Sequence, residues 1–182
     1  MRLLLHTCCG PCSIYPVEVL KSEMEVTGYF FNPNIHPYTE WKARRETLAR
    51  YAEDTGLEMI FDDHYLLEEF IRGVAHREAE RCFFCYGMRL RRTAAATVEG
   101  SFDAFSTTLL VSPYQKHDLI REVGEAVARE SGVRFFYRDF RPGYREASAR
   151  SKEIGMYRQK YCGCIYSENE RFYKHKDRGS GR

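Results

Sequence analysis

The sequence contains no long hydrophobic run. Its first ten residues include three consecutive leucines and one arginine. That apolar stretch is too short for a signal peptide and far too short for a membrane span. We therefore expect a cytoplasmic protein with no membrane partner. In that reducing compartment, closely spaced cysteines are more typical of metal binding or catalysis than of structural disulfides.

The sequence also lacks a strong net charge, an internal repeat and a linker that would divide it. Lys and Arg number 28 against 26 Asp and Glu, so the net charge of +2 gives no sign of a nucleic-acid partner. A chain of 182 residues suits one domain and buries about 70% of its unfolded surface without cross-links. We expect one catalytic domain over residues 1–175 and a disordered polar tail over residues 176–182.

What the sequence does contain is seven cysteines in three tight groups. They form a CCxxC run, a CxxC pair and a CxC pair: Cys8, Cys9 and Cys12; Cys82 and Cys85; Cys162 and Cys164. An odd number argues against a fully paired disulfide framework, and a domain of this size does not need one to fold. The grouping predicts thiolates that converge on one metal-bearing, redox-capable site.

Strand and helix patterns alternate with short connections, which predicts an α/β fold with a parallel sheet and helices on both faces. Strands are expected at residues 2–6, 26–32, 57–61, 104–108 and 133–137. Helices are expected at residues 11–24, 39–55, 65–74, from the CxxC pair to about residue 99, at 118–131, near 144–155, and in a short segment before the tail. Gly56 is the expected stop of the second helix.

The first two cysteine groups lie where a parallel sheet gathers its ligands. Cys8 and Cys9 follow the first strand and precede a helix, and Cys82 and Cys85 lie at another predicted helix start. The partial positive charge of a helix N-terminus lowers the pKa of a thiol and favours the thiolate. Four thiolates in two pairs match the ligands of a cubane iron–sulfur cluster.

Zinc held by four thiolates is the alternative to iron–sulfur. Adjacent Cys8 and Cys9 would crowd a single tetrahedral ion, whereas they can reach different irons of a wider cluster. Three further thiols would also have no use in a closed zinc site. The spacing therefore favours iron–sulfur and leaves zinc open.

The CxC pair differs from the other two groups. Gly163 between Cys162 and Cys164 lets the chain bend sharply. A disulfide closed across one residue is strained and easily reduced, which suits electron relay. The alternative is that both are metal ligands with Cys12 as partner. Cys12 itself is either a ligand to an extra iron or a partly buried helix residue.

Residues 134–160 combine eight basic residues with three acids and six aromatic residues. Basic and aromatic side chains together can hold a nucleic-acid backbone by charge and unstacked bases by stacking. The alternative is a solvated helix face beside aromatic residues of the core.

Four segments resemble the QueH-type epoxyqueuosine reductases of queuosine tRNA modification. They are HTCCGPCS at residues 6–13, CFFCYGMRL at 82–90, STTLLVSPYQKH at 106–117 and GMYRQKYCGCIYS at 155–167. The resemblance implies a single-domain, HUP-like α/β fold, which is related to the ATP-pyrophosphatase group. Those relatives carry a Gly- and Ser-rich phosphate loop after the first strand. Here CCGPC takes its place, which argues against nucleotide hydrolysis.

The reaction implied by the resemblance removes the epoxide oxygen of epoxyqueuosine at the wobble position of a tRNA and leaves queuosine. By the same resemblance, Cys8, Cys9, Cys82 and Cys85 would hold a [4Fe–4S] cluster. Cys162 and Cys164 would be the redox-active pair. An exposed iron in the cluster or adjacent to it, with Cys12 as a further ligand, would polarise the epoxide oxygen. An external electron donor is required, and the sequence does not identify it.

The reaction also needs a proton donor. Tyr114 and His117, in the loop after the fourth strand, are candidates, and Tyr161 and Tyr166 bracket the CxC pair. Each can instead be a packing residue. Three arginines follow the CxxC pair at helical spacing and either contact phosphate or face solvent: Arg89, Arg91 and Arg92.

Two function classes besides a tRNA-modifying reductase fit the cysteine pattern. One is a zinc-stabilised RNA-binding module in which the CxC pair is incidental. The other is a thiol–disulfide oxidoreductase without metal.

Overall fold

The computed structural model describes residues 1–173, so the expected disordered tail at 176–182 lies outside the described residues. Five strands form one parallel sheet in the order β3-β2-β1-β4-β5. Their bounds are Arg2–His6 for β1, Glu25–Phe30 for β2, Glu58–Phe61 for β3, Ala104–Thr107 for β4 and Arg134–Phe135 for β5. The predicted fold class, an α/β parallel-sheet sandwich of the HUP-like type, is confirmed.

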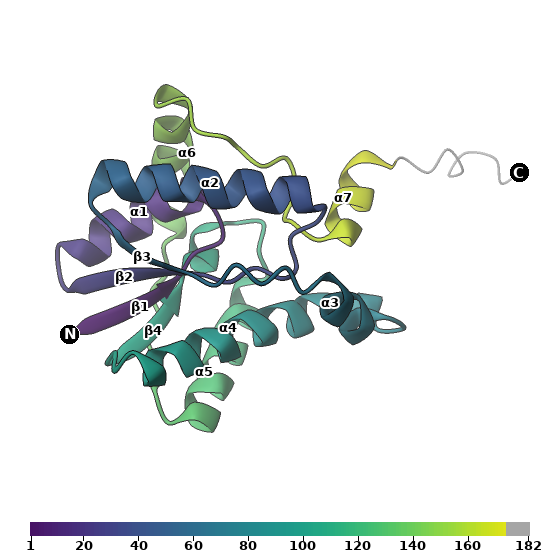
Figure 1. Cartoon of the computed structure of the whole chain (residues 1–182), viewed down its shortest axis with the longest axis horizontal. Coiled ribbons are helices and arrows are strands. Elements are labelled where there is room, and N and C mark those ends of the chain that lie inside the picture. Colours follow the sequence, from purple (N-terminus) through teal and green to yellow (C-terminus); the bar gives the residue numbers. More distant parts are fainter. Residues whose placement is uncertain (174–182) are drawn as a thin grey trace, which may run out of the picture.

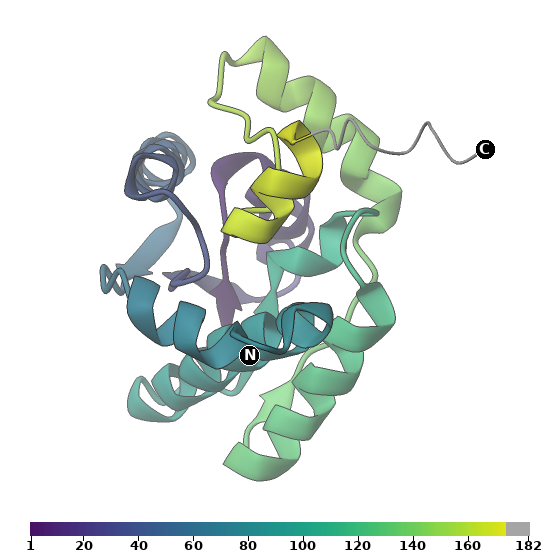
Figure 2. The same ribbon diagram turned by 90° about the vertical axis from the view of Figure 1, so that its right-hand side faces the viewer.

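Seven α-helices among the described residues surround the sheet. They are α1 (Gly10–Lys21), α2 (Tyr38–Thr55), α3 (Leu67–Val74), α4 (Arg81–Glu99), α5 (His117–Ser131), α6 (Tyr144–Glu153) and α7 (Ile165–Phe172). Helices α1, α2 and α6 cover one face of the sheet and α4 and α5 cover the other (Figure 1). Helix α7 lies beyond the carboxyl ends of the strands, and Figure 2 shows it over the middle of that end of the molecule.

The order of the strands places a switch point between β1 and β4. The chain runs outward from β1 through β2 to β3, and then returns to β4 on the other side of β1. The last residues paired between these two strands are His6 and Thr107. In open α/β sheets, ligands bind at the carboxyl ends of the strands where the order reverses. The segments after β1 and β4 therefore form the expected binding region.

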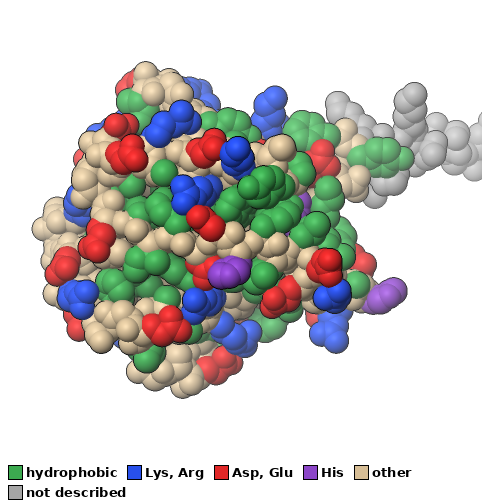
Figure 3. All heavy atoms as spheres, viewed as in Figure 1, with side chains coloured by type: hydrophobic (Ala, Val, Ile, Leu, Met, Phe, Trp, Pro, Cys, Tyr) green, Lys and Arg blue, Asp and Glu red, His purple; other side chains and the backbone are tan. Residues whose placement is uncertain are grey.

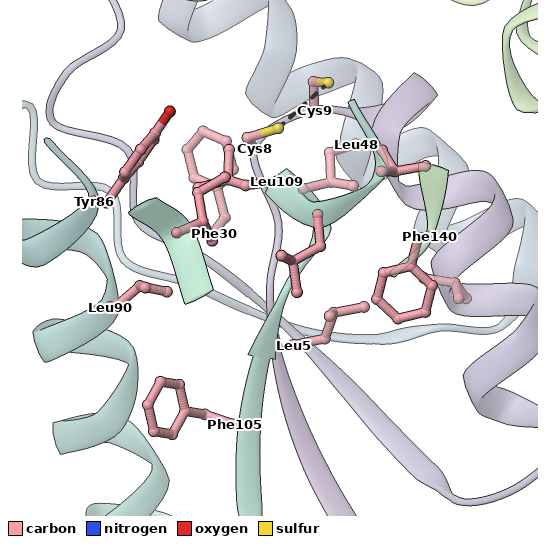
Figure 4. Packing of buried hydrophobic residues seen from close by; sticks show 14 of the residues in the cluster. Leu5, Cys8, Cys9, Phe30, Leu48, Tyr86, Leu90, Phe105, Leu109 and Phe140 are labelled. Atoms are coloured by element: carbon pink, nitrogen blue, oxygen red, sulfur yellow. Dashed lines mark hydrogen bonds between the residues drawn. The ribbon is translucent and has the colours of Figure 1, made fainter. Parts of the chain in front are cut away.

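The central strand is buried on both faces, which explains its uninterrupted leucines. Leu3, Leu4 and Leu5 are fully buried. In Figure 4, Cys8 and Cys9 lie beside the side chains that form the core. The cysteine turn is thus anchored to the most rigid part of the domain.

Several predicted bounds are confirmed and others change for physical reasons. Gly56 ends α2 with a φ of 60°, in the left-handed region that favours glycine. Strand β2 ends at Phe30 instead of residue 32, where its pairing with β1 and β3 also ends, and the Asn32 side chain beyond it donates a hydrogen bond to the Thr7 carbonyl over 2.9 Å. Residues 108–111, expected in strand and loop, form a short 3-10 helix, η2 (Thr108–Val111).

The surface carries charges of both signs. On the face drawn in Figure 3, acidic and basic side chains alternate, in agreement with the small net charge. Within residues 1–173, no helix has both the length and the apolar character that crossing a membrane requires.

Candidate metal and redox site

Three cysteines of the first group lie together at the switch point. The sulfur atoms of Cys8, Cys9 and Cys12 are all within 4.8 Å of one another. Cys9 is the N-cap of α1, and the sulfur atoms of Cys8 and Cys9 are 3.7 Å apart (Figure 4). Thiolates at such distances are suitable ligands for soft metal ions. This group, the N-terminal cysteine trio, can hold a metal.

The three thiols of the trio differ in pKa when no cation is bound. Hydrogen bonds from the thiols of Cys12 and Cys9 lower the pKa of Cys8 well below its usual value. Burial raises the pKa of Cys9, and the hydrogen bond to Cys8 raises the pKa of Cys12. Of the three thiols, Cys8 is therefore the one whose thiolate these contacts favour most. A bound cation would allow all three to ionise, because metal ligation and thiol deprotonation are coupled.

The other four cysteines come from α4 and from the turn before α7. Cys85 is buried and Cys82 half-buried in the first turns of α4, as the sequence predicted. Burial raises the pKa of Cys85 to about 12, and nearby Cys162, Cys164 and Cys82 add to this shift. Neither Cys82 nor Cys85 belongs to the group within 4.8 Å that the trio forms.

A cavity of about 370 Å³ connects the first and third cysteine groups. Cys8 and Cys12 line it on one side and Cys162 on the other. The remaining lining is mainly polar and basic: Arg44, Leu109, Ser112, Tyr114, Gln115, Tyr144, Gln159, Lys160, Tyr161 and Arg171. Cavities of this size accept small organic groups. The cavity thus brings together cysteines of the first and third groups, whereas Cys82 and Cys85 do not line it.

Two glutamine side chains that line this cavity donate hydrogen bonds to cysteine sulfur atoms. Gln159 Nε2 donates to Cys9 Sγ over 3.0 Å and to Cys12 Sγ over 3.6 Å, and Gln115 Nε2 donates to Cys162 Sγ over 3.1 Å. Sequence reasoning missed both residues. Each lies within a segment that carries the family resemblance, so the motif was the available signal.

Arg89 is also part of the site. It is only 2% exposed, and its Nη2 donates to Cys85 Sγ over 3.1 Å. The sequence left Arg89, Arg91 and Arg92 as phosphate contacts or a solvent-facing stripe. Arg91 and Arg92 form ion pairs with carboxylates near the surface, whereas Arg89 faces inward. Its spacing of four residues from Cys85 was the signal that could have placed it on the cysteine face of the helix.

Arg44 is a second buried arginine that the sequence reading missed. It donates from Nη1 to the Cys162 carbonyl over 2.9 Å and from Nη2 to the Tyr161 carbonyl over 3.0 Å. Glu40 neutralises its charge at 2.7 Å, and both side chains are almost fully buried. Arg44 therefore holds the CxC turn against α2 through the backbone of the turn.

Gly163 has the bend that the CxC pair requires. Its φ is +144°, and a Cβ there would lie 3.2 Å from Ile35 and 3.3 Å from Arg44 Nη1. We expect Gly163→Ala to lower the free energy of unfolding by about 1–3 kcal/mol, through backbone strain and displacement of Arg44. Chemical denaturation measures the loss. Gly155→Ala is the matched control, because Gly155 also has a positive φ (65°) but open space around it. Equal losses in the two variants would contradict crowding at Gly163.

The four predicted proton-donor candidates lie in different surroundings. Tyr114 lines the cavity and is 84% exposed. His117 is buried at the first turn of α5, where its Nε2 is 3.0 Å from the Tyr137 hydroxyl, and it does not line the cavity. Tyr161 lines the cavity and donates to the His36 carbonyl. Tyr166 is half-buried beneath Arg81.

The basic segment at 134–160 is only partly available to a polyanion. Arg138, Arg141 and Arg150 form ion pairs with Glu23, Asp139 and Glu18. Lys160 lines the cavity, where Arg171 of α7 joins it. Two basic side chains, Lys160 and Arg171, therefore border the cavity in addition to buried Arg44.

Comparison with known proteins agrees with this geometry. The family model described as epoxyqueuosine reductase QueH matches residues 3–170. A Dehalococcoides mccartyi protein named epoxyqueuosine reductase QueH is 40% identical, over 95% of this chain and 96% of that protein. The Thermotoga maritima protein of the same name is 34% identical over 96% of this chain and 94% of that protein. A Streptococcus pyogenes protein of the same name is 35% identical over 91% of this chain and 69% of that protein. The chain belongs to the epoxyqueuosine reductase QueH family.

Proposed function

We propose that this protein is an epoxyqueuosine reductase that acts on tRNA. The reaction breaks both C–O bonds of the epoxide, forms a C=C bond, consumes two electrons and two protons, and releases the oxygen as water. Its substrate is epoxyqueuosine at the wobble position of an anticodon, and its product is queuosine. The observation that carries the proposal is the family match together with the cavity that Cys8, Cys12 and Cys162 line.

We propose that the cysteine groups hold iron. Cys8, Cys9, Cys82 and Cys85 would be the ligands of a [4Fe–4S] cluster, and Cys12 would bind an additional adjacent iron. The all-sulfur donor set supports this assignment, because soft thiolates favour iron–sulfur clusters. When bound, such a group supplies single electrons and a Lewis acid for an epoxide oxygen.

Cys162 and Cys164 are proposed as the redox pair. Oxidation of the two thiols to a disulfide would release two electrons and two protons, which is what removal of one oxygen atom as water consumes. An external electron donor then restores the thiols. A reducing cytoplasm is the compartment in which this cycle is sustainable.

The cavity supplies contacts for the substrate. Lys160 and Arg171 bring positive charge to it, which suits the phosphates beside a flipped or unstacked nucleotide. Tyr114 and Tyr144 meet edge to face at its wall, with ring centroids 5.8 Å apart. Exposed tyrosine rings are suitable stacking surfaces for a base.

We propose Tyr114 as the proton donor, because it lines the cavity with an exposed hydroxyl. Tyr114→Phe is expected to lower turnover by about 10²–10⁴-fold, the usual contribution of a positioned acid, while the retained ring preserves binding. Steady-state kinetics of tRNA reduction measures the change. His117→Gln is the control and should keep turnover, because His117 does not line the cavity. The reverse pattern would transfer the role to His117.

Two measurements test the proposed function. The protein is purified without oxygen and analysed for iron, sulfide and zinc, and we expect about four or more irons per chain with a broad absorption band. The reduced protein is then incubated with tRNA containing epoxyqueuosine, and its nucleosides are analysed by mass for loss of one oxygen. Stoichiometric zinc in a colourless protein that leaves the nucleoside unchanged would overturn the proposal in favour of a zinc-stabilised RNA-binding module. A metal-free protein that only exchanges thiols would favour a thiol–disulfide oxidoreductase.

A further inference from the structure

Arg89 carries a buried positive charge that no carboxylate balances. Its side chain is 2% exposed, and no Asp or Glu of residues 1–173 forms an ion pair with it. Other arginines of the molecule do have carboxylate partners. Arg91 and Arg92 of the same helix each contact a carboxylate, and buried Arg44 has Glu40 at 2.7 Å.

The groups that face Arg89 are sulfur atoms and neutral acceptors. Its Nη2 donates to Cys85 Sγ over 3.1 Å, and its Nη1 donates to Asn32 Oδ1 over 3.4 Å. The acidic groups that interact with its charge are Cys85, Cys162, Cys8 and Tyr86. The guanidinium therefore contacts Cys85 directly and is close enough to Cys8 and Cys162 for their charges to act on it.

A buried guanidinium without an anion is unfavourable, because the loss of hydration costs several kcal/mol. Burial becomes tolerable when a negative charge lies next to it. A metal bound by these cysteines would hold all of them as thiolates, which gives the guanidinium a larger negative charge than the metal-free thiols do. The surroundings of Arg89 are thus electrostatically complementary to an anionic group held by the cysteines.

We propose that Arg89 is a positioning residue that raises the reduction potential of the metal group held by the cysteines. This inference rests on the iron–sulfur assignment of the proposed function. Reduction adds one negative charge to such a group, so a fixed cation and an N–H···S hydrogen bond stabilise the reduced form more than the oxidised form. Arg89 would thereby make the centre easier to reduce.

The test is an equilibrium redox titration of the iron-loaded protein. At a fixed solution potential, Arg89→Gln is expected to lower the ratio of reduced to oxidised centres by at least about tenfold. For a one-electron couple, this ratio corresponds to a reduction potential lower by about 59 mV. Arg89→Lys keeps the charge but loses the planar donor geometry, so its shift should be smaller. Arg91→Gln is the matched control and should leave the potential unchanged, because Arg91 contacts Glu130 at the surface. Equal potentials in the wild type and Arg89→Gln would overturn the inference.

If Arg89→Gln does not retain iron, its reduction potential cannot be measured, and the thermal stability of Arg89→Lys provides a second test. The melting temperatures of loaded and metal-free Arg89→Lys are compared with those of the wild type in the same two forms. We expect the loss to be larger in the loaded form, because the metal-bound thiolates place more negative charge beside Arg89 than the thiols of the metal-free protein do. Equal losses in both forms would make Arg89 merely structural and overturn the inference. A wild-type protein without iron would overturn the proposed function itself, which distinguishes the two failures.

Discussion

Cys8→Ala is expected to remove the bound metal and to lower turnover by at least about three orders of magnitude, equivalent to about 4 kcal/mol of transition-state stabilisation. Cys8 lies at the switch point of the sheet, shares contacts with Cys9 and Cys12, and lines the cavity. It is also the trio member whose pKa is lowered, which favours the thiolate that metal ligation requires. Iron analysis and nucleoside mass analysis of the same preparation check both expectations.

Ser13→Ala is the matched control for Cys8→Ala. It removes one buried polar atom from α1, the helix that follows Cys8, where the Ser13 hydroxyl donates to the Cys9 carbonyl over 2.9 Å, and it leaves every sulfur in place. This variant should keep its iron and most of its turnover. A Cys8→Ala protein with a full complement of iron would show that Cys8 is not a ligand.

Cys162→Ala should give the opposite combination, with the metal retained and turnover lost by a similar factor. Cys162 belongs to the turn that Arg44 holds through backbone carbonyls, so removal of its sulfur should leave the turn in place. The sulfur itself faces the cavity and accepts a hydrogen bond from Gln115. The measurement is iron content alongside multiple-turnover kinetics, with Ser112→Ala of the cavity wall as the control that should keep both.

A chemical reductant makes the test of Cys162 sharper. A strong one-electron reductant such as dithionite can supply electrons without the CxC pair. It should restore part of the turnover of Cys162→Ala and none of that of Cys8→Ala, because only the latter lacks the metal. Loss of iron from Cys162→Ala would instead assign Cys162 as a metal ligand.

Local patterns were sufficient to predict most of the fold. A buried central strand needs apolar residues on both faces, which is why three leucines identified β1. Gly56 identified the end of α2, because few other residues adopt a left-handed cap. Strand β5 is shorter than its pattern suggested. Arg134 and Phe135 pair with Ala104 and Phe105 of β4, and the pairing ends where Phe136 donates to the Phe105 carbonyl over 2.8 Å.

The candidate site was predictable where its residues lie in motifs and not where they depend on tertiary packing. The three cysteine groups were visible in the sequence, and the parallel sheet brought two of them to one cavity. Arg44 is 118 residues from Cys162 and belongs to a helix with many charged residues. No local signal separates it from Arg45, which pairs with Asp63 at the surface. Arg44 becomes the buried arginine only because α2 packs against the CxC turn with that side chain facing the turn.

Arg44 binds the CxC turn through its backbone, which matters for a turn whose side chains are proposed to change oxidation state. The guanidinium binds the carbonyl oxygens of Tyr161 and Cys162 and not their side chains. These oxygens are unchanged whether the nearby sulfur atoms are reduced or oxidised. If Cys162 and Cys164 act as the proposed redox pair, the main chain of this segment would stay bound to Arg44 in both oxidation states.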